Sequence, residues 1–311
     1  MSGGVHVSTD ELVKLETQAR DLSFVQKARS QRQLAGRMRS SMRGRGLTFE
    51  ELRDYLPGDD IRSIDWRVTA RTTRPFIRVY SEEKERPAII IVDQRINMFF
   101  GSRLSMKSVT AAQAAMLCAW RILGSGDRVG GFVIGDSDTD EVKPHRSRSA
   151  VVAFAERIAR MNAALNASAS IPQNSNQLDT VLESVSNVAH HDHLVLVISD
   201  FDGHTPRTRD LLVRLSSRND VICLLVYDPF LLELPTFGEV VASGGGSQAQ
   251  LAFATEHVRS SIETISRDRG RELLAWQNAL GIPMLPISAA KETAPQLRRL
   301  LEQSAWQQRR R

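Results

Sequence analysis

The sequence predicts an α/β protein built on a doubly wound, mainly parallel β-sheet. Short, unbroken apolar runs alternate with segments of helical periodicity over most of the chain after residue 87. Such runs are typical of strands buried on both faces, and strands that alternate with helices favour parallel pairing. The chain has 311 residues, 41% of them hydrophobic, so it can bury a large core without disulfides or a structural metal.

The spacing of apolar residues places each element of this α/β region. We expect strands over residues 88–92, 128–134, 139–144, 194–198, 221–227 and 282–287. We expect helices over residues 105–123, 149–165, 178–189, 207–217, 253–280 and 294–307, with glycine at the end of the first and fifth. We expect a hairpin or a loop over residues 231–242, before the glycine run 244–246.

The first 86 residues form a separate N-terminal region in this prediction, and residues 87–311 form the α/β domain. A helix is expected over residues 8–29, because apolar residues recur there at helical spacing after a capping serine. The chain has a formal net charge of +5, and residues 1–87 contribute +4 of it. The positive charges concentrate in the strip from Arg29 to Arg45, which fits a solvated connector and a partner-facing surface about equally.

Composition excludes several classes of protein. Two cysteines in 311 residues are too few for a disulfide-framed secreted domain, and Cys118 and Cys223 fall at core positions. No apolar run approaches the roughly 20 residues that span a membrane, and residues 1–14 contain no apolar signal core. We therefore expect a cytoplasmic protein without a membrane span.

Carboxylates follow three of the predicted strands. Asp93, Asp200 and Asp228 come directly after buried runs, and Asp202 lies just beyond the second. Ligands of open α/β sheets bind at this carboxyl edge, where converging carboxylates could hold a hard divalent cation such as Mg²⁺. Acidic residues also favour strand-end turns, and we prefer that interpretation for Asp228, which precedes a proline.

The most distinctive stretch covers residues 49–71. It places acidic and basic residues in alternation around one tryptophan, which predicts a salt-bridged structure packed on the α/β body rather than a catalytic loop. The same residues closely resemble the signature of a bacterial family, domain of unknown function 58, whose body is a von Willebrand factor A-like α/β domain. The resemblance runs from about residue 44 to 135, and its signature residues are Arg53, Tyr55, Pro57, Gly58, Asp59, Asp60, Arg62, Asp65, Trp66 and Arg71.

The resemblance implies where an ion would bind. Von Willebrand-type domains hold Mg²⁺ through an Asp-x-Ser-x-Ser motif after the first strand, a threonine in a second loop and an aspartate after the fourth strand. Here Asp93 and Asp200 match the two aspartates, whereas Arg95 and Asn97 replace the serines and Asn176 replaces the threonine. Both carboxylates are kept and all three hydroxyls are lost.

The guanidinium of Arg95 decides what such a site can do. It has no lone pair to offer a cation and remains charged at any working pH, so it opposes a divalent ion. We predict that Arg95 replaces the metal by pairing with Asp93 and with Asp200, and that no cofactor is required. The alternative is that Arg95 turns to solvent and Asn97 supplies an amide oxygen to an ion.

Three functions follow from these features. The resemblance implies a non-catalytic adaptor that works with a MoxR-type AAA+ ATPase and other von Willebrand-type proteins, with Phe99, Phe100 and Asp202 on the contact edge. The second is a metal-dependent hydrolase or phosphoryl-transfer enzyme that uses Asp93 and Asp200. The third, which we disfavour, is nucleic-acid binding through the basic strip and the tail 309–311, since few aromatics accompany those charges. The cluster from His190 to His193 fits an exposed turn better than a zinc site.

Overall fold

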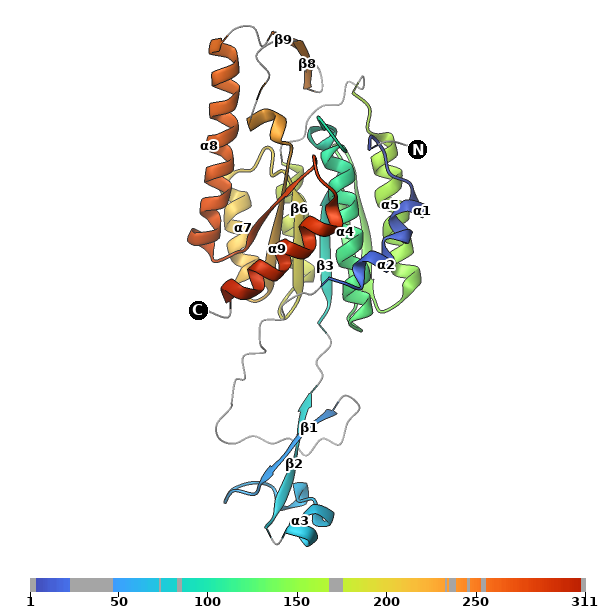
Figure 1. Ribbon diagram of the computed structural model, residues 1–311, viewed down its shortest axis with the longest axis vertical. Helices are drawn as coiled ribbons and strands as arrows, with labels where there is room; N and C mark the ends of the chain where they lie inside the picture. The colour runs from blue at the N-terminus through green and yellow to red at the C-terminus, as the bar shows by residue number, and fades with distance from the viewer. Residues whose placement is uncertain are drawn as a thin grey trace. The chain divides into compact units, whose positions relative to one another are not determined.

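The computed structural model describes residues 4–22, 47–72, 74–82, 86–167, 176–232, 234, 239–244, 247–252 and 256–308. The chain forms two compact units (Figure 1). We call residues 1–28 with 86–311 the α/β unit, and residues 29–85 the small unit. This differs from the predicted division, because residues 1–28 group with the α/β unit instead of with the signature motif.

A six-stranded sheet forms the centre of the α/β unit. Its order is β10-β7-β6-β3-β4-β5, and every neighbouring pair is parallel except β4 with β5. The strands are β3 (Ala88–Asp93), β4 (Val129–Ile134), β5 (Thr139–His145), β6 (Leu194–Ser199), β7 (Asp220–Tyr227) and β10 (Met284–Ser288). The mainly parallel sheet is therefore confirmed.

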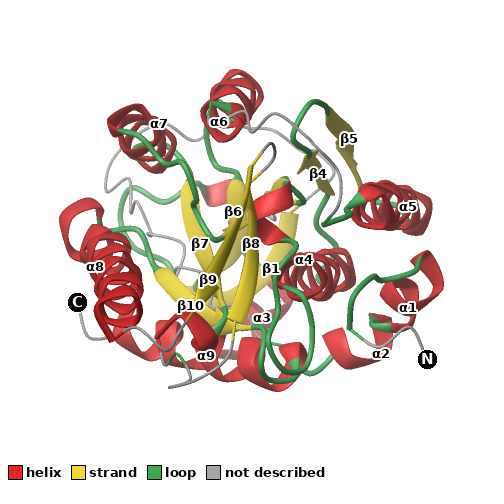
Figure 2. Cartoon of the chain, turned by 90° about the horizontal axis from the view of Figure 1, so that it is seen from above, coloured by secondary structure: helices red, strands yellow, loops and turns green. Residues whose placement is uncertain are grey.

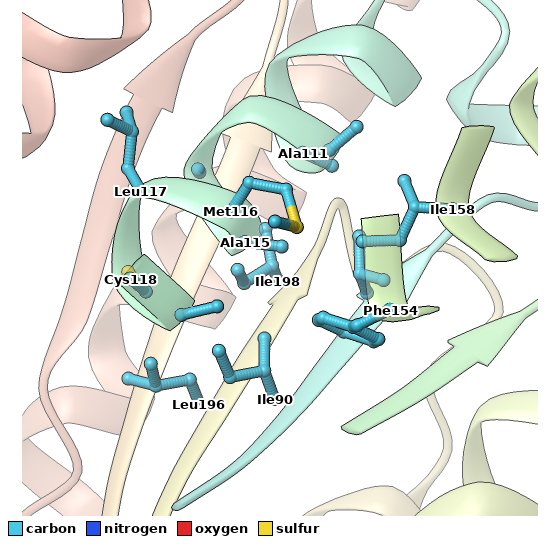
Figure 3. Close-up of a cluster of buried hydrophobic side chains, with 14 of the residues drawn as sticks. Ile90, Ala111, Ala115, Met116, Leu117, Cys118, Phe154, Ile158, Leu196 and Ile198 are labelled. Atoms are coloured by element: carbon cyan, nitrogen blue, oxygen red, sulfur yellow. The ribbon is translucent and has the colours of Figure 1, made fainter. Parts of the chain in front are cut away.

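Helices cover both faces of this sheet (Figure 2). One face carries α4 (Lys107–Gly124), α5 (Arg148–Ala164) and α9 (Thr293–Gln308), and the other carries α6 (Gln177–Val188), α7 (Pro206–Ser216) and α8 (Glu256–Leu280). Ile90 faces the first layer, whereas Ile89 and Ile91 face the second, since successive strand side chains point to opposite faces. Figure 3 shows Ile90 with buried side chains of α4, α5 and β6.

One close approach fixes the spacing between β4 and α5. A Cβ atom at Gly131 would lie 2.2 Å from the carbonyl oxygen of Ile90 and 2.7 Å from Cζ of Phe154. Glycine at this position lets the ring of Phe154 rest directly on the strand backbone.

The N-terminal segment packs on the first helical layer. It contains α1 (Thr9–Lys14) and α2 (Glu16–Ala19), and Ser8 and Glu11 form a capping box at the start of α1. Leu12 and Leu22 are buried in the same core as α4 and α5. The single predicted helix over residues 8–29 is thus two short helices within the described part, because the chain bends at Leu15, whose ψ is −10°.

The small unit is built on one antiparallel pair, β1 (Leu47–Asp54) with β2 (Phe76–Glu82). The 3₁₀ turn η1 (Ile61–Ser63) and the helix α3 (Trp66–Thr72) connect these strands.

In the α/β unit, 3₁₀ turns η2 (Ile96–Met98) and η3 (Pro229–Leu232) follow β3 and β7. β8 (Glu239–Gly244) pairs antiparallel with β9 (Ser247–Ala252), so this strand pair lies a few residues later in the chain than the predicted excursion over residues 231–242.

Candidate functional site

The candidate site lies at the switch point of the sheet. β3 and β6 are neighbours, but the chain leaves β3 for α4 on one face and leaves β6 for α7 on the other. Asp93 is the last residue of β3, and Asp200 directly follows β6. The topology therefore brings these two aspartates to the place where open α/β sheets bind their ligands.

Arg95 forms a two-pronged ion pair with Asp93. Its Nε and Nη2 atoms donate to Oδ1 and Oδ2 of Asp93 at 3.0 and 2.7 Å, and both side chains are almost fully buried. Burial works to lower the pKa of Arg95, but the charge and hydrogen bond of Asp93, together with the charges of Asp200 and Asp202, outweigh it and leave that pKa above its ordinary value. The predicted pairing of Arg95 with Asp93 is confirmed.

Asp200 pairs with Lys107 instead of with Arg95. Nζ of Lys107 lies 2.5 Å from Oδ2 of Asp200, and both side chains are 9% exposed. Nδ2 of Asn97 donates to Oδ1 of Asp200 at 2.7 Å, so the amide nitrogen of Asn97 faces this carboxylate. Burial works to raise the pKa of Asp200, but Lys107 and then Arg269 outweigh it and hold that pKa below the ordinary value.

Two further side chains complete the network. Arg269 of α8 donates to Oδ1 of Asp202 at 2.7 Å and to the carbonyl oxygen of Asp200 at 3.0 Å. Ser199 donates to Oδ2 of Asp93 at 2.6 Å. The network thus balances three cations against three carboxylates, namely Arg95, Lys107 and Arg269 against Asp93, Asp200 and Asp202.

Sequence reasoning missed Lys107, Arg269 and Asp136. Asp136 follows β4, accepts from the backbone N–H of Ile96 at 2.8 Å, and has its pKa raised by burial. A signal for Lys107 was available, because a lysine in the first turn of a helix opposes the helix dipole unless a carboxylate faces it. Arg269 carried no such signal, since it lies in the middle of a long amphipathic helix.

These residues do not fit a bound divalent ion. A divalent ion would need the free oxygens of Asp93 and Asp200, and Arg95 and Lys107 occupy them with donors that cannot ligate a metal. Within the described residues, no group of three His, Cys, Asp or Glu side chains is placed to hold a metal.

Other candidate residues lie outside this network. Asn176 is exposed at the N-terminal end of α6, whereas Asp93 and Asp200 are buried. Asp228 is buried, and its carboxylate accepts from both the N–H and the hydroxyl of Ser102, at 2.9 and 2.6 Å. Asp228 therefore ties the loop after β3 to the end of β7.

The two candidate aromatic anchors pack within the chain. Phe99 stacks on His6 with ring centroids 5.4 Å apart, and Phe100 lies 6.0 Å from Phe230. Both phenylalanines are half-buried, so each keeps part of its ring accessible.

The N-terminal segment braces the loop that supplies Arg95, Asn97 and Lys107. Asn162 of α5 is fully buried, accepts from the N–H of Val7 at 2.9 Å and donates to Oε1 of Gln94 at 2.9 Å. The N–H of Met106 donates to the carbonyl oxygen of Gly4 at 2.7 Å. The segment therefore holds this loop at both of its ends.

The signature residues form the frame of the small unit. Arg53 binds Asp59 through two hydrogen bonds of 2.8 and 2.9 Å, beside the turn that contains Tyr55 and the Pro57–Gly58 pair. Gly58 has a φ of +105°, which favours glycine. The predicted salt-bridged structure is present, and its residues belong to the small unit.

Asp60 and Asp65 cap the two helical turns of this frame. Asp60 accepts from the N–H of Arg62 at 3.0 Å. Asp65 accepts from the N–H of Arg67 at 3.0 Å and from Nε of Arg78 at 2.8 Å, and the hydrogen bond from Arg78 lowers the pKa of Asp65. Of the remaining signature residues, Arg62, Trp66 and Arg71 are exposed.

The histidine cluster is a surface turn. His190 and His191 are exposed, and Asp192 has a φ of 59° in the bend between α6 and β6. Cys118 and Cys223 are fully buried core residues, and this burial raises the pKa of both thiols to about 12. The basic strip from Arg29 to Arg45 and the tail 309–311 lie outside the described residues.

Fold and site together define a mixed α/β protein with a charge-balanced cluster at the switch point of a mainly parallel sheet. The chain belongs to the family described as "Protein of unknown function DUF58", whose model matches residues 51–272. No helix among the described residues combines the length and the apolar character needed to cross a membrane.

Several known proteins resemble this chain. An uncharacterized protein of Mycobacterium tuberculosis strain H37Rv is 28% identical over 280 residues, covering 90% of this chain and 86% of that protein, and one from Mycobacterium bovis matches to the same extent. Among solved structures, the conserved hypothetical protein BatB from Bacteroides thetaiotaomicron is 12% identical with a TM-score of 0.39, over 73% of this chain and 100% of that one. An aerotolerance-related membrane protein from Bacteroides fragilis is 13% identical with a TM-score of 0.39, over 71% of this chain and 99% of that one.

Proposed function

We propose that this protein is a non-catalytic interaction module, with a von Willebrand factor A-like α/β unit whose ion site is degenerate. In this proposal it acts as an adaptor for a MoxR-type AAA+ ATPase during assembly or activation of protein complexes. One observation carries the proposal: both aspartates at the switch point are neutralised by buried cations of the chain, Asp93 by Arg95 and Asp200 by Lys107.

Internal neutralisation favours binding over catalysis at this edge. A general base or a metal ligand needs a carboxylate oxygen that substrate, water or metal can reach. The carboxylate of Asp93 instead accepts hydrogen bonds from Arg95 and Ser199. The carboxylate of Asp200 accepts hydrogen bonds from Lys107 and Asn97. The pairs keep the loops after β3 and β6 in one arrangement, which suits a preformed contact surface.

The half-buried ring of Phe100 lies on the same loop as Arg95 and Asn97. Aromatic side chains that are fixed on one side and accessible on the other are frequent anchors of protein interfaces. Asp202 adds a partly exposed carboxylate next to this loop, with 42% of its side chain exposed. We therefore assign the contact with the ATPase to this edge.

The test is a titration of the purified chain with the MoxR-type AAA+ ATPase from the same organism, in the presence of ATP and Mg²⁺. We expect saturable binding that Phe100→Ala weakens by about tenfold or more. Val213→Ala is the matched control, because Val213 is an exposed apolar residue of α7. Thermal unfolding of Phe100→Ala should show that the variant remains folded.

Two results would contradict the proposal. Absence of binding by the wild-type chain would exclude the ATPase as a partner. An unchanged affinity of Phe100→Ala would exclude the edge after β3 and β6 as the contact site. A phosphatase or nuclease activity that depends on Mg²⁺ or Mn²⁺ and disappears in Asp93→Asn would favour the enzyme instead.

A further inference from the structure

We infer that the small unit carries its own docking surface, centred on Trp66, for an acidic segment of a partner protein that also contains apolar side chains. This surface belongs to a different unit from the sheet edge after β3 and β6. It does not depend on the ATPase, so the two proposals can fail separately.

Large apolar side chains are concentrated on the surface of the small unit. Its stretch from residue 52 to 66 holds four of the nine large apolar residues that are exposed in the described chain, namely Leu52, Leu56, Ile61 and Trp66. Trp66 is 65% exposed, Ile61 62% and Leu56 60%. Isolated exposed apolar residues are normal, but four of them within fifteen residues of one small unit, a tryptophan included, supply the apolar side chains that a binding surface needs.

Exposed arginines accompany these side chains. On α3, residues 66, 67, 70 and 71 are all exposed. Arg67 and Arg71 are four residues apart and so form one row along the helix, next to the row that begins with Trp66. Arg62 is exposed in the turn just before α3. Within the described part of the chain, no carboxylate pairs with Arg62, Arg67 or Arg71.

The carboxylates of the same motif are used inside the unit. Asp59 pairs with Arg53, Asp65 pairs with Arg78 and caps α3, and Asp60 caps η1. The acidic residues thus hold the frame while Arg62, Arg67 and Arg71 remain available. A partner that satisfies these arginines must bring its own negative charges.

The mixture of side chains favours a protein partner. Tryptophan and arginine are the residues most enriched at the energetic centres of protein interfaces. A nucleic acid would need further stacking rings, whereas Leu56 and Ile61 are aliphatic and Trp66 is the single exposed aromatic among the apolar residues described here. A second small unit is a poor occupant, since its motif carboxylates are engaged as well.

The first experiment places the photo-reactive residue p-benzoylphenylalanine at position 66 of the full chain, irradiates cells and identifies the cross-linked peptides by mass spectrometry. We expect a cross-link to a segment of another protein in which Asp or Glu residues flank apolar ones. The proposal is overturned if the cross-links reach only this chain's own residues 86–311, a second copy, or RNA, or if none form.

The second experiment titrates the purified full chain with a synthetic peptide of that cross-linked segment. We expect Trp66→Ala and Arg67→Glu each to weaken binding by about tenfold or more, and the peptide with Asn and Gln in place of its acids to bind equally poorly. Leu274→Ala, an exposed position on α8, is the control and should bind like the wild type. Equal affinities for all variants and both peptides would overturn the proposal.

Discussion

The ion pair between Arg95 and Asp93 is deeply buried. It constrains the structure mainly because breaking it costs free energy. Removing two charges from water costs free energy that their attraction only partly returns, so such a pair adds little net stability. Removing one partner, however, leaves a charge buried without compensation. The side chains of Arg95 and Asp93 are 4% and 0% exposed. The loop after β3 is therefore held in the conformation in which these two side chains stay in contact.

Replacing Arg95 tests this role directly. We expect Arg95→Met to lower the free energy of unfolding by about 3–5 kcal/mol, because Asp93 would remain buried beside an apolar side chain. Urea denaturation at pH 7 measures the change. The control is Arg207→Met, which breaks an exposed pair with Glu183 and should cost less than about 1 kcal/mol. Equal losses for the two variants would contradict the assigned role of Arg95.

Lys107 makes a prediction about pH. The folded-state pKa of Asp200 lies below its ordinary value of 3.8, so Asp200 stabilises the fold fully above that pH and loses its contribution as the pH falls through the lowered pKa. In Lys107→Met the carboxylate loses its nearest cation, and the wild type should be more stable at pH 7. The difference should shrink as acid neutralises Asp200.

Urea denaturation of both proteins between pH 7 and about pH 3 checks this prediction, since a neutral carboxyl group no longer needs a counter-ion. Lys143→Met is the matched control, because Lys143 is exposed on the edge strand β5. A stability difference between wild type and Lys107→Met that stays constant over this range would show that Lys107 does not act through Asp200.

The sequence predicted one cation of this network and not the others. Arg95 stands two residues after Asp93, inside a motif whose spacing is known, so its conflict with a metal could be reasoned out. Lys107 contacts Asp200 only because α4 begins beside the end of β6, a result of the tertiary fold. Its unfavourable place at a helix N-terminus was the available clue.

Among elements, the N-terminal segment has the clearest structural role. Asn162 links the N–H of Val7 to the side chain of Gln94, and thereby connects this segment, α5 and the loop after β3. The segment thus contributes to the shape of the candidate site although no residue of it belongs to the ion-pair network described above.

Asn162→Ala should loosen this connection. We expect a loss of about 1–3 kcal/mol in the free energy of unfolding, because the buried N–H of Val7 and the buried amide oxygen of Gln94 lose their partners. Hydrogen exchange should show faster exchange at Val7. Asn187→Ala, at an exposed position of α6, is the control and should leave both measurements unchanged. Unchanged exchange at Val7 in Asn162→Ala would contradict the bracing role.

Gly131 tests the packing of α5 on the sheet. We expect Gly131→Ala to cost about 1–3 kcal/mol, because its methyl group would collide with the carbonyl oxygen of Ile90 and the ring of Phe154. Gly124→Ala is the control, since a Cβ atom there meets nothing within 4 Å and alanine favours a helix. Thermal and urea unfolding compare the two, and a tolerated Gly131→Ala would show that α5 can move away from β4.

Elements with strong apolar patterns were predictable, and elements made of charged residues were not. Strands β3 and β6 are almost continuous apolar runs, so their places could be read within one residue. β1 contains four charged residues among eight and gives no clear alternation, so its pairing with β2 was not foreseen. Those charges serve the frame of the small unit, as Arg53 does with Asp59.

For the whole molecule, the two units suggest two different contact surfaces. The edge after β3 and β6 is charge-balanced and fixed by internal pairs, whereas the surface around Trp66 combines exposed apolar groups with exposed arginines. The proposed adaptor role requires at least two contact surfaces, and our two proposals place one on each unit of the chain. The charge excess near the N-terminus indicated a docking region, but not which arginines would be available.

The central claim is that Arg95 and Lys107 take the place of a divalent ion between Asp93 and Asp200. Calorimetric titration of the wild-type chain with Mg²⁺ and with Mn²⁺ tests it most directly. We predict no binding at micromolar concentrations of either ion, and a gain of binding in the double variant Arg95→Ser with Lys107→Met. Micromolar binding by the wild type that Asp93→Ala abolishes would contradict the claim.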